Sequence, residues 1–393
     1  QASVVGKIIK DQHYTVYAGD KKLVDGPIEK INEGFVYDRP MSKKMIVSKD
    51  EGLPEIDEYN DLMLKILAHE NVSSREAVYE SYDKNVQGRV ANERGQTNAG
   101  VVAPFDSDKF PSEIKEDCFS AALSHNPAIG KIDPYLVAQY AVLEGCAKTV
   151  SVGATPLALT DCLCFGNPEK PEEMWQFSQS CLAIREVCDN MRFNETKNLP
   201  IVAGNVSFYN QSGDRSIPAS PMIGCFGKIK KKKVLKNGFQ SLSSNLFLLG
   251  ETPTFLGGSI VSDVLGVNNT KIEALDLKKY NNMLGCVLEA SEKALLQSCS
   301  YVGLGGLATT VTKMSFLNNI GCVVEGLDKD CLFSENLSFV VEVSEKNSEA
   351  FEKILNNKNC SYKQIGKTID SNKVAIENFI ELDIIKAKKV WKS

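Results

Sequence analysis

Two short apolar runs, each interrupted by polar residues, constrain this 393-residue chain more than any other feature. The runs are LALTDCLCF, residues 157–165, and PIVAGNVSF, residues 200–208. Short continuous apolar runs bounded by Pro and Gly are typical of buried strands. The polar groups toward their ends are Asp161, Gly204, Asn205 and Ser207. Because the ends of neighbouring buried strands commonly open on one crevice, the sequence predicts that these groups share a ligand site.

Each of these groups has a structural alternative. Asp161 could cap a loop, but a buried unpaired carboxylate costs on the order of several kcal/mol, so it needs a nucleotide, a metal or a hydrogen-bonded loop as partner. Gly204 could only relieve crowding in a strand, or it could let a phosphate approach the backbone. Asn205 supplies a neutral oxygen of the kind that Mg²⁺ accepts beside phosphates and waters. Strand alternation places Asn205 and Ser207 on one face.

Composition indicates a soluble globular protein with two or three domains. The chain is 43% hydrophobic and 24% charged, with a formal net charge of −5. No global basic field attracts it to nucleic acid, and no apolar stretch reaches the roughly 18 residues of a membrane span. The one basic cluster, KIKKKK at residues 228–233, is interpreted as a solvated loop between domains because no aromatic residues interleave. We therefore expect neither a nucleic acid nor a membrane as partner.

The 12 cysteines indicate a reducing compartment. Most lie within apolar helix or strand patterns, where a free thiol acts as a small buried hydrophobe. No CxxC pair occurs, which gives a zinc site little support. Cys162 and Cys164 should share one face of their strand, in the core. We expect a cytoplasmic protein without disulfides.

The chain divides into four segments by pattern. Residues 1–40 begin with a strand at 2–10 and continue with a hairpin that turns at Gly19 and Asp20. Residues 41–97 are a charged connector that packs on the next domain, with helices over 58–68 and 73–85. Two α/β domains follow, over 98–227 and 228–393.

Helical and strand patterns fill both domains. The first should contain a helix from Asp133 that ends at Gly153, a helix over 172–191, and the two apolar runs as strands. The second should contain the strands LFLLG and LSFVVEVS and helices over 278–298 and 347–355. The predicted fold class is α/β (α+β).

Several blocks of the chain resemble, in order, the second half of phosphoribosylformylglycinamidine synthase, large component. The blocks are VVGKI, YDRP, YDKNVQG, IDPY, the two apolar runs, LLGET, LGGS and LFSEN. The resemblance implies tandem N-terminal and C-terminal domains like those of aminoimidazole ribonucleotide synthetase. It also implies that strands 1–40 close a domain of a preceding half.

By this resemblance, the whole enzyme converts formylglycinamide ribonucleotide, ATP and glutamine-derived ammonia to formylglycinamidine ribonucleotide, ADP and phosphate. Asp161 and Gly204 would contact ATP, Asn205 would coordinate Mg²⁺, and Ser207 would contact the ribonucleotide. We assign no catalytic residue, because the family's catalytic His lies in the preceding half. The implied partners are that first half, a glutaminase subunit and a small accessory subunit.

A second nucleotide pocket of the family has lost its metal ligands here. The resemblance puts Ser124 in place of an Asp, Lys148 in place of an Asn, and Tyr301 and Leu304 in place of two further aspartates. Only Glu144 survives, and Lys148 one helical turn away should pair with it. We therefore expect no Mg²⁺-bound ADP in this pocket.

Other interpretations stay open from sequence alone. Glu335 in LFSEN resembles a substrate-binding Glu of the family's first half, but it is more plausibly a residue that braces a loop. The chain could be a non-catalytic structural half that binds no nucleotide, or a self-sufficient homodimer, which the lost acidic residues disfavour.

Overall fold

The described part of the chain forms two compact units. The structure, a computed structural model, describes residues 1–32, 36–81, 85–193 and 198–393. The units are Gln1–Pro40 and Met41–Ser393. In the smaller unit β1 (His13–Ala18) pairs antiparallel with β2 (Lys21–Pro27), and α1 (Ile28–Asn32) follows. The predicted hairpin is confirmed. The predicted strand over 2–10 is wrong, because no neighbouring strand is there to satisfy its backbone.

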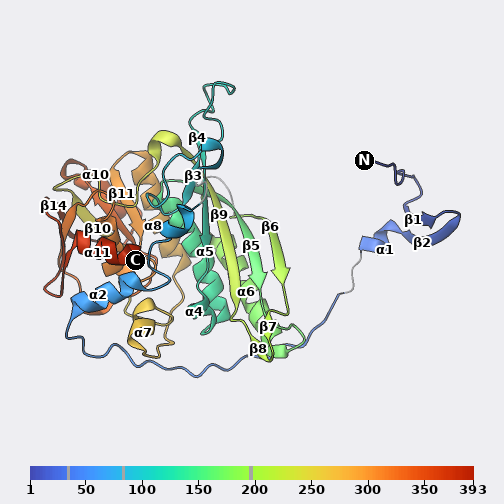
Figure 1. Cartoon of the computed structure of the whole chain (residues 1–393), viewed down its shortest axis with the longest axis horizontal. Helices are drawn as coiled ribbons and strands as arrows, with labels where there is room; N and C mark the ends of the chain where they lie inside the picture. Colours follow the sequence, from blue (N-terminus) through green and yellow to red (C-terminus); the bar gives the residue numbers. More distant parts are fainter. Residues whose placement is uncertain (33–35, 82–84, 194–197) are drawn as a thin grey trace. The chain divides into compact units, whose positions relative to one another are not determined.

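The first sheet of the larger unit contains both apolar runs as neighbouring strands (Figure 1). Its strands, in spatial order, are β3 (Gly100–Val102), β4 (Asp117–Ser124), β9 (Ser220–Lys230), β5 (Thr155–Cys164) and β6 (Ile201–Ser207). Only β5 and β6 pair parallel, because α6 (Pro171–Asn190) connects them as a crossover. The other pairings in this sheet are antiparallel.

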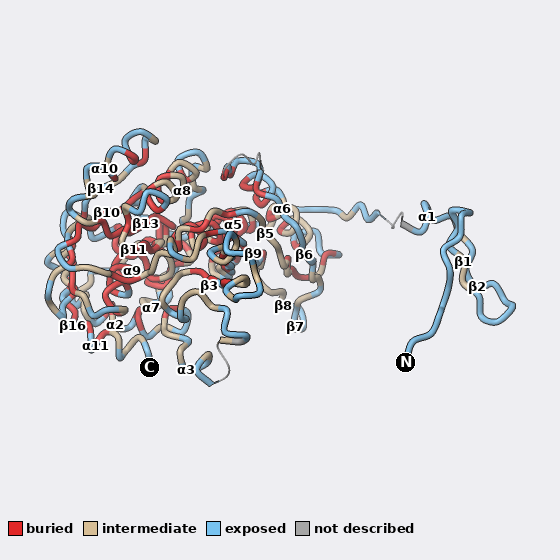
Figure 2. Tube along the Cα trace, turned by 90° about the horizontal axis from the view of Figure 1, so that it is seen from above, coloured by how far each residue is buried: buried red, intermediate tan, exposed pale blue. Residues whose placement is uncertain are grey.

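Helix α5 (Pro134–Ser151) packs between the first sheet and the second domain. Asp133 caps it by accepting hydrogen bonds from the backbone N–H groups of Tyr135 and Leu136, and Pro134 fits its first turn. The helix ends just before Gly153, whose φ of +83° is available to glycine without strain, as predicted. Most of α5 is buried because it has protein on every side (Figure 2).

The central strands of the second sheet are buried on both faces. Its strands, in spatial order, are β11 (Leu296–Tyr301), β13 (Phe339–Val343), β10 (Asn245–Leu249), β14 (Tyr362–Ile369), β12 (Gly321–Val324), β15 (Lys373–Ile376) and β16 (Ile380–Asp383). Phe247 and Leu249 pack with α8 (Leu277–Glu292) and α10 (Glu345–Asn357). Leu246 and Leu248 face the opposite side. The predicted apolar strands at β10 and β13 are confirmed.

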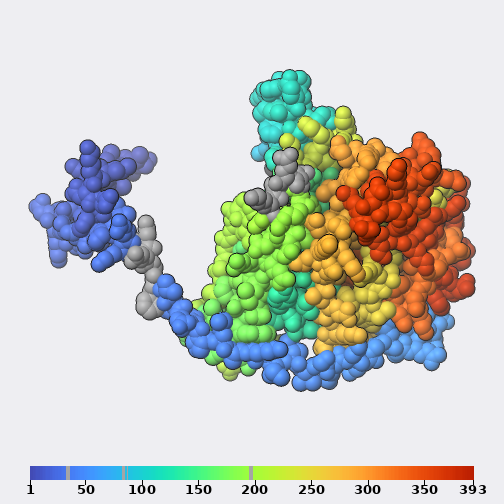
Figure 3. Space-filling view, turned by 180° about the vertical axis from the view of Figure 1, so that it is seen from behind, coloured from blue at the N-terminus to red at the C-terminus, as the bar shows by residue number. Residues whose placement is uncertain are grey.

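The connector packs on both domains: Val90 pairs with Val102 of β3 in the domain that follows, as predicted, and its helix packs on the second sheet. Helix α2 (Tyr59–Ala68) joins α9 (Gly306–Met314) and α11 (Ile384–Lys392) on the face formed by Leu246 and Leu248. Before α2, the extended chain runs along the surface of both domains (Figure 3). Its backbone bonds to Pro171 and to the hydroxyl of Thr270.

Three further predictions from the sequence differ from the structure. The helix predicted over 278–298 ends at Glu292, and β11 begins at Leu296, because Ala294 turns with a φ of +54° between them. The helix predicted over 73–85 is reduced to α3 (Glu76–Tyr79), and residues 82–84 lie outside the described residues. The lysine run is not a free loop: it begins within β9, and Lys230 and Lys231 pair with Asp117 and Asp106.

The remaining short elements are α4 (Pro127–Gly130), α7 (Ile260–Leu265), β7 (Gln211–Ser212) and β8 (Arg215–Ser216), with 3₁₀ turns at Val86–Gly88, Lys231–Lys233 and Lys329–Cys331. No helix in the described ranges combines the length and apolar character needed to cross a membrane.

The position of α2 predicts that the connector is part of the core of the second domain. Ile66 is fully buried, so Ile66→Ala should lower the free energy of unfolding by about 2–5 kcal/mol through lost contacts and a residual cavity. Lys65→Ala, on the exposed side of the same helix, should change it by no more than about 0.5 kcal/mol. Urea unfolding of both variants measures the difference. Equal effects would contradict the packing of α2.

Candidate functional site

Asp161 lies inside β5 and not at its end. It pairs with Gly204 across the parallel β5–β6 ladder, one position before the pair Cys162 and Asn205. Alternation places Asp161 on the same face as the buried Leu159 and Leu163, toward α6. Its charge accordingly raises the pKa of the thiols of Cys181 and Cys188 on α6, although burial raises both more.

Gly204 makes room for the Asp161 carboxylate. A β-carbon at position 204 would lie 2.3 Å from Oδ1 of Asp161, well inside van der Waals contact. Burial raises the pKa of Asp161, and a hydrogen bond from the backbone of Asn205 partly offsets that rise. Of the two interpretations of Gly204, this geometry matches the one in which the glycine relieves crowding.

Asn205 and Ser207 lie on the opposite face of the sheet from Asp161. Asn205 is exposed on β6, and the Ser207 hydroxyl hydrogen-bonds with the Asn210 side chain at 3.2 Å. The neighbouring thiols of Cys162 and Cys164 are 3.7 Å apart on this same face. They share a face as predicted, but they are only half-buried rather than in the core. Asp161 thus points to the opposite face from Asn205 and Ser207, and the ligand assignments of Asp161, Gly204, Asn205 and Ser207 stay predictions.

The face that carries Asn205 and Ser207 is largely apolar and is not covered by the described residues of Met41–Ser393. We call it the open face. Large hydrophobic side chains exposed on it are Phe119, Leu123, Met222 and Phe226. Leu123 is 78% exposed, and its neighbours in the sequence, Ala122 and Ser124, point into the helix-covered side. An apolar patch that spans several strands is typical of a protein–protein interface.

A separate cavity of about 550 Å³ lies between α5, α9, α11 and the connector, and its lining includes none of Asp161, Gly204, Asn205 and Ser207. The Lys148 ammonium is 3.0 Å from Oε1 of Glu144, so the predicted pair is confirmed. The Tyr301 hydroxyl donates to the same oxygen at 3.0 Å. The Glu144 carboxylate is therefore already neutralised by groups of this chain.

The other replaced positions supply no metal ligand to this cavity. The Ser124 hydroxyl is buried and donates to the backbone carbonyl of Ala141 at 2.5 Å. Leu304 lines the cavity with an apolar side chain. Among the described residues, no group of three or more His, Cys, Asp and Glu side chains could hold a metal ion. The residues present do not fit the metal that the family resemblance implies for this pocket.

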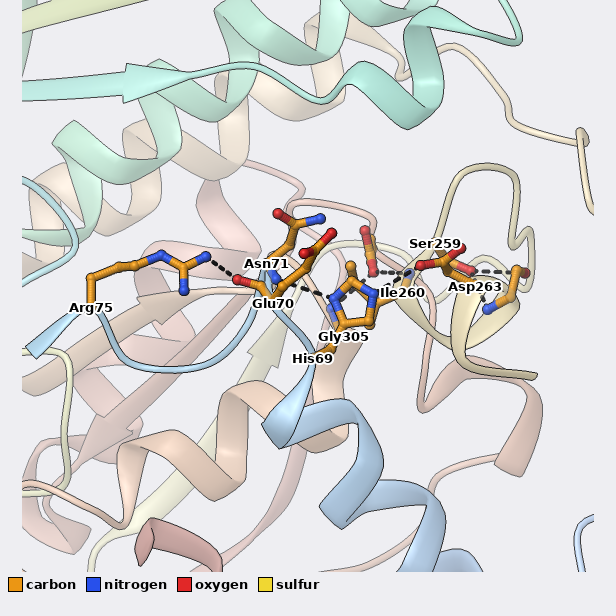
Figure 4. Close-up of polar contacts among 10 residues, drawn as sticks. His69, Glu70, Asn71, Arg75, Ser259, Ile260, Asp263 and Gly305 are labelled. Carbon is orange, nitrogen blue, oxygen red and sulfur yellow. Dashed lines mark hydrogen bonds and ion pairs between the residues drawn. The ribbon is translucent and has the colours of Figure 1, made fainter. Parts of the chain in front are cut away.

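Glu335 braces two loops at the edge of the cavity, near Ile260 and Gly305, which Figure 4 labels. Its Oε1 accepts hydrogen bonds from the backbone N–H groups of Ile260 and Gly305, each at 2.8 Å, at the starts of α7 and α9. A carboxylate at a helix start is stabilised by the unpaired N–H groups there. The same close-up shows His69 of the connector bound to Asp263 of α7 through Nε2 at 2.9 Å. The bracing role expected for Glu335 agrees with this geometry.

Sequence patterns did not identify Lys313 and Trp391, which also line this cavity. The Lys313 ammonium lies 5.8 Å from the centre of the Trp391 ring. Lys313 is the charged residue of α9 and the one side chain of this helix that is not buried. Nothing in the local sequence shows that it meets Trp391, which lies on another helix.

Glu335 should make folding stability depend on pH. Burial raises its pKa from 4.5 to about 7, although the two backbone hydrogen bonds lower it. A carboxyl group with a higher pKa in the folded chain binds more protons there than when unfolded, so stability falls as pH rises from about 4.5 to about 7.

The Glu335→Gln variant should lack this loss, which amounts to at most about 3 kcal/mol. Urea unfolding between pH 4.5 and 8 would measure it. Glu345→Gln, at an exposed position of α10, should keep the wild-type slope. Parallel curves for wild type and Glu335→Gln would contradict the assignment.

Comparisons with known proteins agree on one family. Residues 97–229 match "AIR synthase related protein, N-terminal domain", and residues 245–377 match "AIR synthase related protein, C-terminal domain". The phosphoribosylformylglycinamidine synthase subunit PurL of Methanothrix thermoacetophila is 31% identical over 411 residues, which cover 100% of this chain and 52% of that protein.

Two solved structures share the fold. PurL of T. maritima complexed with FGAR aligns with a TM-score of 0.64 at 14% identity, over 83% of this chain and 52% of that chain. The same protein complexed with ADP aligns with a TM-score of 0.62 at 14% identity, over 84% and 52%. The chain thus spans about half the length of these relatives. With both of its large domains matched in order, the chain belongs to the AIR synthase related family and aligns with one half of PurL.

Proposed function

We propose that this chain is one half of an ATP-dependent phosphoribosylformylglycinamidine synthase and forms one wall of a composite site. The main observation that supports this proposal is the uncovered open face. An exposed apolar face built from β4 and β9 is unfavourable in water, and a second domain of matching shape would remove it from solvent. The relatives are about twice as long as this chain, so the partner proposed for this face is the other half of the same enzyme.

The proposed reaction joins glutamine-derived ammonia to formylglycinamide ribonucleotide at the expense of ATP. The amide oxygen attacks the γ-phosphate, and ammonia then displaces phosphate. Such chemistry depends on positioning and on neutralising the phosphate charge. Ser207, half-buried beside Asn210, is placed to contact the ribonucleotide at the edge of the open face.

Asn205 can supply one ligand to a magnesium site that it shares with other groups, but it cannot form such a site alone. Its exposed amide offers a single neutral oxygen, and Mg²⁺ in phosphate-transfer sites commonly takes few protein ligands beside phosphates and waters. The ion would neutralise charge on the phosphates of ATP. Asp161 supports Asn205 from the other face, because its carboxylate accepts a hydrogen bond from the Asn205 backbone. Asp161 and Gly204 face away from Asn205. An ATP molecule bound at Asn205 would therefore have to extend around the exposed edge strand β6 to contact them.

A non-catalytic structural half is the second candidate. The separation of Asp161 and Asn205 on opposite faces favours it, because the predicted ATP and metal ligands do not converge within this chain. In either case we propose that the protein works in the cytoplasm, with a glutaminase subunit and a small accessory subunit as further partners.

Calorimetric titration with ATP and Mg²⁺ separates the two candidates. The composite site predicts no binding to this chain alone and binding once the other half is added. Asn205→Ala should then raise the Mg²⁺ concentration required for half-maximal activity by roughly tenfold, since one ligand is lost. Val206→Ala, which pairs with Leu163 on the opposite face of the same strand, should leave it unchanged. If Asn205→Ala behaves as wild type in the assembled enzyme, the structural candidate stands and the composite site fails.

A charged substitution on the open face tests whether this face is the interface with the other half. Leu123→Asp should weaken association with the other half by at least roughly tenfold, because it would bury an unpaired carboxylate in the interface. Ile385→Asp, on an exposed position of α11, is the matched control and should not change association. Both should leave the free energy of unfolding within about 0.5 kcal/mol of wild type. Analytical ultracentrifugation of mixtures measures association, and equal behaviour of the two variants would exclude the open face as the interface.

A further inference from the structure

The cavity between α5, α9 and α11 has an excess of positive charge. The cationic side chains that line it are Lys148, Lys313, Lys388, Lys392 and Arg94, and the carboxylates are Glu76, Glu144 and Glu335. Each carboxylate already has a partner in this chain. Glu76 pairs with Lys392, Glu144 with Lys148, and Glu335 with two backbone N–H groups. One oxygen of each carboxylate is therefore already engaged by groups of this chain.

Two of the lysines have no carboxylate partner among the described residues. Lys313 lies 5.8 Å from the Trp391 ring, and Lys388 donates to the backbone carbonyl of Phe316 at 2.6 Å. Phe316 and Trp391 are packed together, with ring centroids 5.5 Å apart, so both lysines border one aromatic pair. Lys313 is the exposed side chain of α9, and burial lowers the pKa of the half-buried Lys388. An anion would offset the unpaired positive charge of both ammonium groups.

The rest of the lining suits a small polar ligand. A volume of about 550 Å³ lies in the range of ligand sites. Tyr140 and Tyr301 form part of the wall, with their hydroxyls held by the Glu273 carbonyl and Glu144. His125 also lines the cavity, and its Nδ1 is buried without a hydrogen-bond partner. Buried polar atoms of this kind are ordinarily satisfied, so this nitrogen points to a missing partner.

We propose that this cavity binds a phosphate-bearing metabolite directly on its lysine ammonium groups, without a divalent cation. Lysine binds phosphate as a point charge, and two neighbouring ammonium groups match a group with two or more negative charges better than a single carboxylate. Lys148 forms an ion pair with Glu144, the carboxylate that a metal ion would otherwise use as a ligand. The site is independent of the open face and of the composite site proposed there.

Inorganic pyrophosphate is the probe that tests this proposal. Isothermal titration of the 393-residue chain should show binding in EDTA that is at least as tight as in excess MgCl₂, since magnesium only competes with the lysines for the anion. Binding that requires Mg²⁺, or no binding at all, would overturn the proposal.

Variants of Lys313 locate the site. Lys313→Met should weaken pyrophosphate binding by at least roughly tenfold, and Lys313→Arg, which keeps the charge, should retain most of the affinity. Lys353→Met, on an exposed position of α10, is the matched control and should bind as wild type. Thermal melts show that each variant is folded. Unchanged affinity in Lys313→Met, or equal loss in Lys353→Met, would place the anion elsewhere and refute the cavity as its site.

Discussion

The packing of α5 between two sheets determines how the rest of the larger unit is arranged. One side of the helix lies on β4 and β9, where Gly145 allows close approach: a β-carbon there would lie 3.1 Å from the side chains of Cys225 and Ser124. The other side joins the apolar cluster of α8, β10 and β13. Because a single helix completes both cores, the two domains are held as one body, and the burial of α5 is favourable by the hydrophobic effect on both sides.

This arrangement uses only one face of the first sheet. Helices α5 and α6 pack on the face that contains Leu159 and Leu163, and nothing in the described part of Met41–Ser393 covers Leu123 or Phe226 on the other. A five-stranded sheet with one covered face normally has polar residues on its free face. Here that face is apolar, which is the physical reason for treating it as an interface and not as a solvent surface.

The sequence predicted what depends on local pattern and failed where register or long-range packing decides. The hairpin at Gly19, α5 from its Asp133 cap, and the Glu144–Lys148 pair follow from neighbours within a few residues, and all are present. The apolar runs were correctly identified as strands, but a run does not reveal which face a polar residue takes. Asp161 is accommodated in mid-strand only because Gly204 lies beside it, and that pairing is a property of the sheet.

The charge of the inter-domain cavity could not be read from sequence for a similar reason. Lys313 and Trp391 are 78 positions apart and meet only because α9 and α11 cover the same face of the second sheet. A metal site and an anion site impose opposite requirements on such a cavity. A metal ion needs carboxylates that converge on it, whereas an anion needs cationic side chains whose charge is not offset by carboxylates. In this chain Glu144 pairs with Lys148, and Glu335 accepts hydrogen bonds from backbone N–H groups at the starts of two helices. Because Lys313 and Lys388 have no carboxylate partner among the described residues, a negatively charged ligand would be favoured there.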